Sequence, residues 1–498
     1  MFIACRTWTL NDPMQPLAPP TQSPAARTEG ALLSFLFAGV TLWWLISGAP
    51  DMLGGSGDAN SIWITISQWD GARGPSSYVL YKGMLSVYPY VWLRELALAA
   101  GLDPFTFIRA WHALLFAVGS TLAVPAIASV FTGRPWNALQ RCLFAVTLLW
   151  LTRTTRVYDL LMIDLPSWSF FAIACWTALR SCDAHGCTRL AWSAAAGGFI
   201  GLSLCGSGQF GLSALVMLAY LALRYLLQVP PASHAGRILL FAQLVIVVAC
   251  AWVPREADLQ FHAKIVDTMR SRGDWLPTAQ QWVHSSVFRL MDTYSNSFRF
   301  ATPSQRGVAL LKDALGAQFE TLYPQIKSGR GLLTIRDYIG LVITHPLDFA
   351  AMWTTRAFMV ISLDQNRASA SALLAGYTSV FLCLLLLVRG CNTLRDILRP
   401  ELLLLAALLL TVAGPVALAL EMRNALTIHS TMLAVAVQIL TSRVTLNQSA
   451  SASFTPWLLR RIPWVWVAYL AFITFCFGYY GVTMELTGSN PRVVLFTP

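Results

Sequence analysis

Two aspartates stand where an apolar chain turns polar, and a carboxylate at such a place could act as a general base. Asp58 lies in the glycine-rich stretch GGSGDAN after the apolar run 31–49, and Asp164 opens another apolar run. A carboxylate at the end of a membrane span usually faces a cavity, because a charge facing lipid is costly. When it lies within hydrogen-bond reach of a hydroxyl, it can remove the proton. Both residues are therefore candidates for catalysis.

Each aspartate also has a structural interpretation. Asp164 is followed by Leu165-Pro166, and an acid followed by proline suits the first turn of a helix, where it caps the helix or stabilises its dipole. An aspartate in a loop is more often solvated than catalytic. The glycines before Asp58 offer it no obvious capping partner and permit close backbone approach to a ligand. Asp58 is therefore the stronger candidate for the base.

Basic side chains that could bind a phosphate lie in the same polar segments of the chain. Arginine and lysine form charge-assisted hydrogen bonds with phosphate oxygens. The segment 254–346 also contributes ionisable residues, among them Arg255, His262 and Lys264. The predicted phosphate-binding residues are Arg73, Lys82 and Arg423, and the other site candidates are Asp70, Arg109, Asp159 and His345.

The composition predicts which elements position these residues. Of the 498 residues, 56% are hydrophobic and only 12% are charged, and the mean hydropathy is +0.57. A soluble domain carries roughly 25% charged residues. The apolar runs approach the ~20 residues that a helix needs to cross a bilayer, and they do not alternate as the strands of a membrane barrel do. The predicted fold class is an all-α polytopic membrane protein.

Eleven membrane spans are predicted, with interfacial helices in the aromatic-rich first loop, 50–106. The predicted organisation is a cytoplasmic tail (1–30), a transmembrane module (31–253), an extracytoplasmic domain with an interfacial helix at 348–363 (254–369), C-terminal transmembrane helices (370–482) and a short outer tail (483–498). The predicted spans are 31–49, 107–131, 138–151, 166–180, 191–206, 210–228, 237–253, 370–388, 401–420, 427–442 and 462–482.

The net charge of +11 is explained by basic residues that predict the orientation of the spans, rather than by nucleic-acid binding. With the N-terminus inside, every short cytoplasmic segment carries arginine, for example Arg141 and Arg180, as the positive-inside rule requires. No long basic cluster or nucleic-acid motif is present. This orientation places Asp58 and Asp164 on the extracytoplasmic face. The N-terminal 30 residues do not resemble a signal peptide, and the expected location is a bacterial inner membrane.

The order of these features resembles the GT-C superfamily, integral-membrane glycosyltransferases that use polyprenyl-phosphate-linked sugars and include protein mannosyltransferases and aminoarabinose transferases. The resemblance covers residues 31–260 well and 340–440 loosely. Two departures are Ala59, where many members have a second acid, and Gln209, where a lysine is expected. The matching features are the early acid Asp58, Tyr88-Pro89, Gly101 and Arg109 at the entry to the second span, Asp164 at the fourth, and His345-Pro346.

The resemblance implies an inverting transfer of a sugar from a lipid-phosphate donor to a hydroxyl of a glycan, lipid or protein acceptor. Asp58 would be the general base, and Asp164 would orient the acceptor or position Asp58. No cofactor is predicted with certainty. A divalent metal is possible, but the missing acidic pair does not support it.

Three other functions remain open on the sequence alone. A polysaccharide polymerase or ligase would show similar arginine-rich outer loops. A lipid or sugar transporter would instead place ionisable residues near the bilayer midplane and often shows inverted repeats, which are not found here. A non-catalytic scaffold subunit would fit Gln209 and the single acid at position 58.

Overall fold

The computed structural model is helical wherever it describes the chain. The described residues are 94% helical and contain no strand, which confirms the all-α prediction for them. They comprise 24–47, 52–53, 57–67, 83–152, 158, 161, 164–206, 210–228, 234–271, 312, 316–321, 324, 335–360, 370–390, 400–417, 425–441 and 463–478.

Each of the eleven predicted spans coincides with a helix. Three helical segments, Thr28–Ser47, Pro104–Thr132 and Ile238–Thr268, are long and apolar enough to cross a membrane, whereas the full eleven-span arrangement stays a prediction. The helices are α1 (Pro24–Ser47), α5 (Pro104–Val118) continuing through η2 (Gly119–Ala123) into α6 (Val124–Thr132), α7 (Ala138–Thr152), α8 (Asp164–Asp183), α9 (Gly186–Gly206), α10 (Gly211–Gln228), α11 (His234–Ser271), α17 (Ala370–Gly390), α18 (Pro400–Ala417), α19 (Leu426–Thr441) and Pro463–Gly478.

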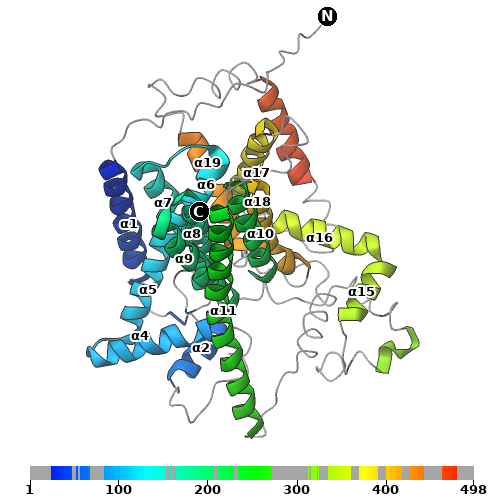
Figure 1. The fold of residues 1–498 in the computed structure, drawn as a ribbon. Coiled ribbons are helices and arrows are strands. Elements are labelled where there is room, and N and C mark those ends of the chain that lie inside the picture. The colour runs from blue at the N-terminus through cyan, green and yellow to red at the C-terminus, as the bar shows by residue number, and fades with distance from the viewer. Residues whose placement is uncertain are drawn as a thin grey trace, which may run out of the picture.

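Helix α8 lies at the centre of the bundle and is buried along most of its length (Figure 1). Trp168 is fully buried and donates a hydrogen bond from its indole to Ser430 Oγ on α19 at 3.0 Å. Its ring packs onto Gly119 in η2, where a Cβ would lie 2.6 Å from the indole. The π-helical turn η2 and its glycine therefore make room for the largest side chain at the centre.

Glycines bring α9 and α11 into backbone contact. A Cβ at Gly197 would lie 2.3 Å from the carbonyl oxygen of Val247, and one at Gly201 would lie 2.4 Å from that of Ala251. Small residues four apart let two helices approach closely, as in the GxxxG pattern of membrane helices. This contact fixes α11 against the bundle.

Helix α11 runs unbroken through Pro254, beyond 253, where the predicted span ends. Proline in a helix interior removes one backbone hydrogen bond. Here Cys205 Sγ on α9 donates to the carbonyl oxygen of Pro254 at 3.2 Å. Helices α9 and α11 are therefore in contact at the position where the predicted span ends.

Short helices lie outside the long ones. Helix α4 lies across one end of the bundle, near α2 and the lower part of α11 (Figure 1). The predicted helices of loop 50–106 and the predicted helix at 348–363 are present, while their positions at a membrane surface stay predictions. These elements are α2 (Gly57–Ser67), η1 (Met84–Ser86), α4 (Tyr88–Ala99), η5 (Gly316–Gln318), α15 (Ile335–Thr344) and α16 (Pro346–Val360).

Candidate functional site

The segments that carry the two candidate aspartates are joined by a backbone hydrogen bond. The amide of Leu161 donates to the carbonyl oxygen of Met52 at 3.0 Å, and both residues are fully buried. Met52 precedes Asp58 by six residues, and Leu161 precedes Asp164 by three. Two parts of the chain that are far apart in the sequence are therefore held side by side at the end of the bundle where α8 begins.

Asp58 lies in the first turn of α2, so the second half of GGSGDAN is helical rather than a loop. The physical reason is an apolar face: Ala59, Ile62 and Ile66 are all buried, and their spacing is that of one side of a helix. These side chains belong to the same core cluster as Tyr90. An acid in a first helical turn is favoured by the helix dipole. The side chain of Asp58 itself lies outside the described part of the structure.

Asp164 is the first residue of α8 and is half-buried. Its position fits the dipole interpretation made from the sequence, but it also has a neighbour of chemical interest. Burial raises the pKa of the Tyr90 phenol well above its usual range, and the negative charge of Asp164 raises this pKa further. The structure therefore brings Asp164 to α4, within the first loop.

Tyr90 belongs to a buried hydrogen-bonded chain. The Tyr90 hydroxyl lies 3.1 Å from Nε2 of His112, and Nδ1 of His112 lies 3.0 Å from the carbonyl oxygen of Tyr158. A carbonyl oxygen only accepts, so Nδ1 must carry the proton and Nε2 must accept from Tyr90. The chain connects α4 and α5 with the segment before α8, and it fixes the orientation of the phenol beside Asp164.

The remaining predicted residues divide into three groups. Arg109 lies on α5, half-buried and three residues before His112, and so belongs to the helix that bounds the site. His345 lies at the corner between α15 and α16, where its amide donates to Leu341. Helix α15 packs on α16, and α16 packs on α18. Asp70, Arg73, Lys82, Asp159 and Arg423 lie outside the described residues.

A buried carboxylate that was not among the predicted site residues anchors the first loop at η1. Asp258 on α11 accepts hydrogen bonds from the amide of Met84 at 2.8 Å and from Arg255 at 2.9 Å, and His262 Nε2 lies 3.6 Å from it. Buried charges are retained where they are paired and hydrogen-bonded. Asp258 therefore ties η1, and with it the start of α4, to α11.

Gly83 makes this close approach possible. Its φ of 72° lies in the left-handed region, and a Cβ there would lie 2.2 Å from the carbonyl oxygen of Cys205 on α9. Glycine is the residue that adopts such a conformation at low cost. The first loop thus contains a junction of three elements, which are η1, α9 and α11.

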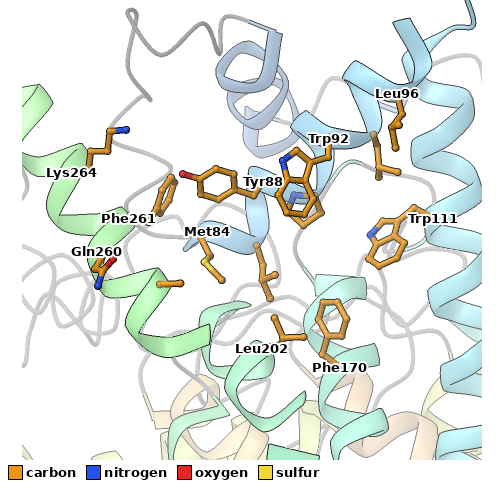
Figure 2. A pocket seen from close by; sticks show the side chains of 14 residues that line it. Met84, Tyr88, Trp92, Leu96, Trp111, Phe170, Leu202, Gln260, Phe261 and Lys264 are labelled. Carbon is orange, nitrogen blue, oxygen red and sulfur yellow. The ribbon is translucent and has the colours of Figure 1, made fainter. Parts of the chain in front are cut away.

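A pocket of about 740 Å³ lies beside this site, among α4, α5, α8, α9 and α11 (Figure 2). Its α4 wall consists mainly of Tyr88, Trp92 and Leu96, which share one helix face because they are four residues apart. Trp111 on α5 and Phe170 on α8 form another wall, with ring centroids 6.4 Å apart. Its size falls within the range of roughly 300–1,000 Å³ of small-molecule sites.

Comparisons with known proteins give no relative for this chain: no family model, curated protein or solved structure matches it. In the described part of the chain, no group of three or more histidine, cysteine, aspartate or glutamate residues is placed to hold a metal ion.

Sequence reasoning missed Tyr90, His112 and Asp258 as members of the site. A signal was present for His112, because a histidine inside an apolar helix usually indicates a specific partner. Asp258 lies three residues after Arg255 and four residues before His262. This spacing places the three ionisable side chains on one helix face. Tyr90 follows Tyr88-Pro89 of the motif, but its burial follows from the packing of α4 on α5.

Proposed function

We propose that this chain is a membrane glycosyltransferase that takes a sugar from a polyprenyl-phosphate-linked donor and transfers it to an acceptor hydroxyl. The observation that supports the proposal best is the meeting of two distant sequence features. The segments carrying Asp58 and Asp164 are joined through Leu161 and Met52, beside a large pocket. The resemblance gives both acids a role in one reaction.

The proposed reaction is an inverting displacement at the anomeric carbon. The acceptor oxygen forms a bond to this carbon as the bond from the carbon to the lipid phosphate breaks. The proton of the acceptor hydroxyl passes to Asp58, and the electron pair of the broken bond leaves with the phosphate. Asp164, oriented beside the Tyr90 phenol, holds the acceptor or positions Asp58. Arg73, Lys82 and Arg423 remain proposed contacts of the leaving phosphate.

The proposed setting is a bacterial inner membrane with the site on its extracytoplasmic face. The charge distribution along the chain supports this orientation. In it, the donor approaches from the bilayer, and its phosphate and sugar reach the α4 end of the bundle. A glycan, a lipid or a protein could present the acceptor hydroxyl.

A transfer assay in detergent tests the proposal against the transporter alternative. The purified full chain would be incubated with a panel of synthetic polyprenyl-phosphate sugars and a soluble acceptor such as an alkyl glycoside. Release of polyprenyl phosphate with formation of a new glycoside is expected for wild type, and its loss is expected for Asp164→Asn. A transporter shows no net activity without a sealed membrane, so sugar transfer in detergent would exclude the transporter alternative. If the folded protein shows no turnover with any donor, the proposal is contradicted.

A further inference from the structure

The pocket has an apolar body and a polar end. Trp92, Leu96 and Trp111 lie at one side, and Gln260 and Lys264 of α11 lie at the other (Figure 2). The hydroxyl of Tyr88 points toward the α11 side in the same view. Such an arrangement suits a ligand with a long apolar part and one polar end, because the small number of polar groups in a pocket fixes a ligand's orientation.

Lys264 supplies a positive charge at the polar end, where Gln260 is hydrogen-bonded to Glu256. Among the described residues that line the pocket, exposed Lys264 is the one charged side chain and none is acidic. Arg255 on the same helix is engaged by Asp258, whereas in the part of the chain that the structure describes no carboxylate pairs with Lys264. An ammonium group in this position attracts an anion and can donate hydrogen bonds to its oxygens.

The body of the pocket suits a single flexible hydrocarbon chain. The lining face of α4 is separate from its packing face, because Tyr90 and Val91 point into the core while Tyr88 and Trp92 line the pocket. Trp and Tyr side chains are also typical of the level at which membrane lipids meet water. A lipid could therefore enter from the bilayer without disturbing the buried Tyr90–His112 chain.

We infer that this pocket binds the isoprenoid chain of a polyprenyl phosphate and that Lys264 contacts its phosphate. The inference rests on the proposed function for the identity of the lipid. It assigns the phosphate contact to α11, rather than to Arg73, Lys82 or Arg423 alone. It also places the phosphate on the same helix as Asp258, which anchors the first loop at η1.

Equilibrium binding of radiolabelled farnesyl phosphate to the full chain in phosphatidylcholine nanodiscs tests the inference. Lys264→Gln should weaken binding by about tenfold, because it removes a hydrogen bond to a charged group. Lys264→Arg should restore most of the affinity, and farnesol should bind wild type and Lys264→Gln equally. These two comparisons separate a phosphate contact from a change in folding.

A second pair of variants tests the apolar body. Ala257 lines the pocket and Ala263 does not, and both are exposed on α11. Ala257→Trp should fill the pocket and weaken farnesyl phosphate and farnesol together, whereas Ala263→Trp should leave both unchanged. Thermal stability of each variant in detergent shows whether it is folded.

Three results would overturn the inference. The first is an unchanged affinity for farnesyl phosphate in both Lys264→Gln and Ala257→Trp. The second is that phosphatidylglycerol displaces radiolabelled farnesyl phosphate as well as unlabelled farnesyl phosphate does. The third is that inorganic phosphate displaces it equally well. Phosphatidylglycerol competition would assign the pocket to bulk phospholipid. The proposed function fails separately: if Asp164→Asn transfers sugar normally while Lys264→Gln binds farnesyl phosphate weakly, the lipid site stands and the assignment of the acids is wrong.

Discussion

The hydroxyl of Tyr90 donates a hydrogen bond to Nε2 of His112 over 3.1 Å, with both side chains fully buried between α4 and α5. Tyr90→Phe would leave the imidazole nitrogen buried and without its donor. An unsatisfied buried polar group costs about 1–3 kcal/mol, so the variant should unfold at a lower temperature in detergent. Tyr90→Phe removes a single oxygen atom, so a loss of stability reports on the interactions of this hydroxyl.

The same pair predicts a pH dependence. Burial, helped by the charge of Asp164, raises the pKa of Tyr90 in the folded state, whereas a tyrosine in the unfolded chain has a pKa of about 10. Above about pH 10 the unfolded chain loses this proton and the folded chain retains it, so the stability that Tyr90 contributes falls as pH rises. The difference in unfolding free energy between wild type and Tyr90→Phe should shrink between about pH 9 and pH 11. A constant difference across that range would show that Tyr90 is not held protonated.

Gly83 and Gly101 form a matched pair for testing the junction of η1, α9 and α11. Their φ angles are 72° and 69°, but a Cβ at Gly83 would lie 2.2 Å from Cys205, whereas one at Gly101 would meet nothing within 4 Å. Gly101→Ala should lower the free energy of unfolding by about 1–2 kcal/mol, because alanine is disfavoured in the left-handed conformation. Gly83→Ala should cost clearly more and should also weaken farnesyl phosphate binding, because η1 lines the pocket. Equal losses of stability in the two variants would mean that the contact with Cys205 is not made.

Gly197 and Gly198 test the packing of α9 on α11 in the same way. Gly197→Ala would place a Cβ 2.3 Å from the carbonyl oxygen of Val247, while Gly198→Ala meets nothing within 4 Å. In a helix, alanine is favoured over glycine by about 0.5–1 kcal/mol. Gly198→Ala should therefore raise the unfolding temperature slightly and Gly197→Ala should lower it. If both variants raise it, the two helices are not in backbone contact.

Asp258→Ala tests the anchor between the first loop and α11. The substitution leaves the amide of Met84 without its acceptor, so the expected loss is about 1–3 kcal/mol. Asp258→Asn retains an acceptor oxygen and should lose less. Asp267→Asn, at an exposed position on the same helix, serves as the control. Limited proteolysis should cut the chain faster at η1 in Asp258→Ala than in this control, and identical cleavage would contradict the anchoring role.

The sequence predicted the helices well where local signals were strong. Asp164-Leu165-Pro166 carries the signature of a helix start, and α8 begins at Asp164. The predicted span ends at residue 253, whereas α11 continues through Pro254 and packs closely on Gly197 and Gly201 of α9. Asp58 was predicted in a loop because of its glycines, while the buried face of α2 makes the residue helical.

The site was predicted only in part because its geometry depends on distant contacts. The sequence nominated Asp58 and Asp164 together, and the bond between Met52 and Leu161 places their segments side by side. Tyr90 and His112 lie on two helices whose crossing no local pattern specifies. Asp258 meets Met84 across 174 positions of sequence, and no periodicity indicates such a pairing.

The measurement that tests the central claim most directly is the glycolipid profile of cells that carry wild type, Asp58→Asn or Asp164→Asn in place of the native chain. Asp183→Asn, at the opposite end of α8 from Asp164, is the matched control. We expect one glycolipid to lose a sugar in Asp58→Asn, as in cells without the protein, a strong reduction in Asp164→Asn and no change in the control. An unchanged profile in Asp58→Asn, with the variant folded and present at the wild-type level, would contradict the assignment of the general base.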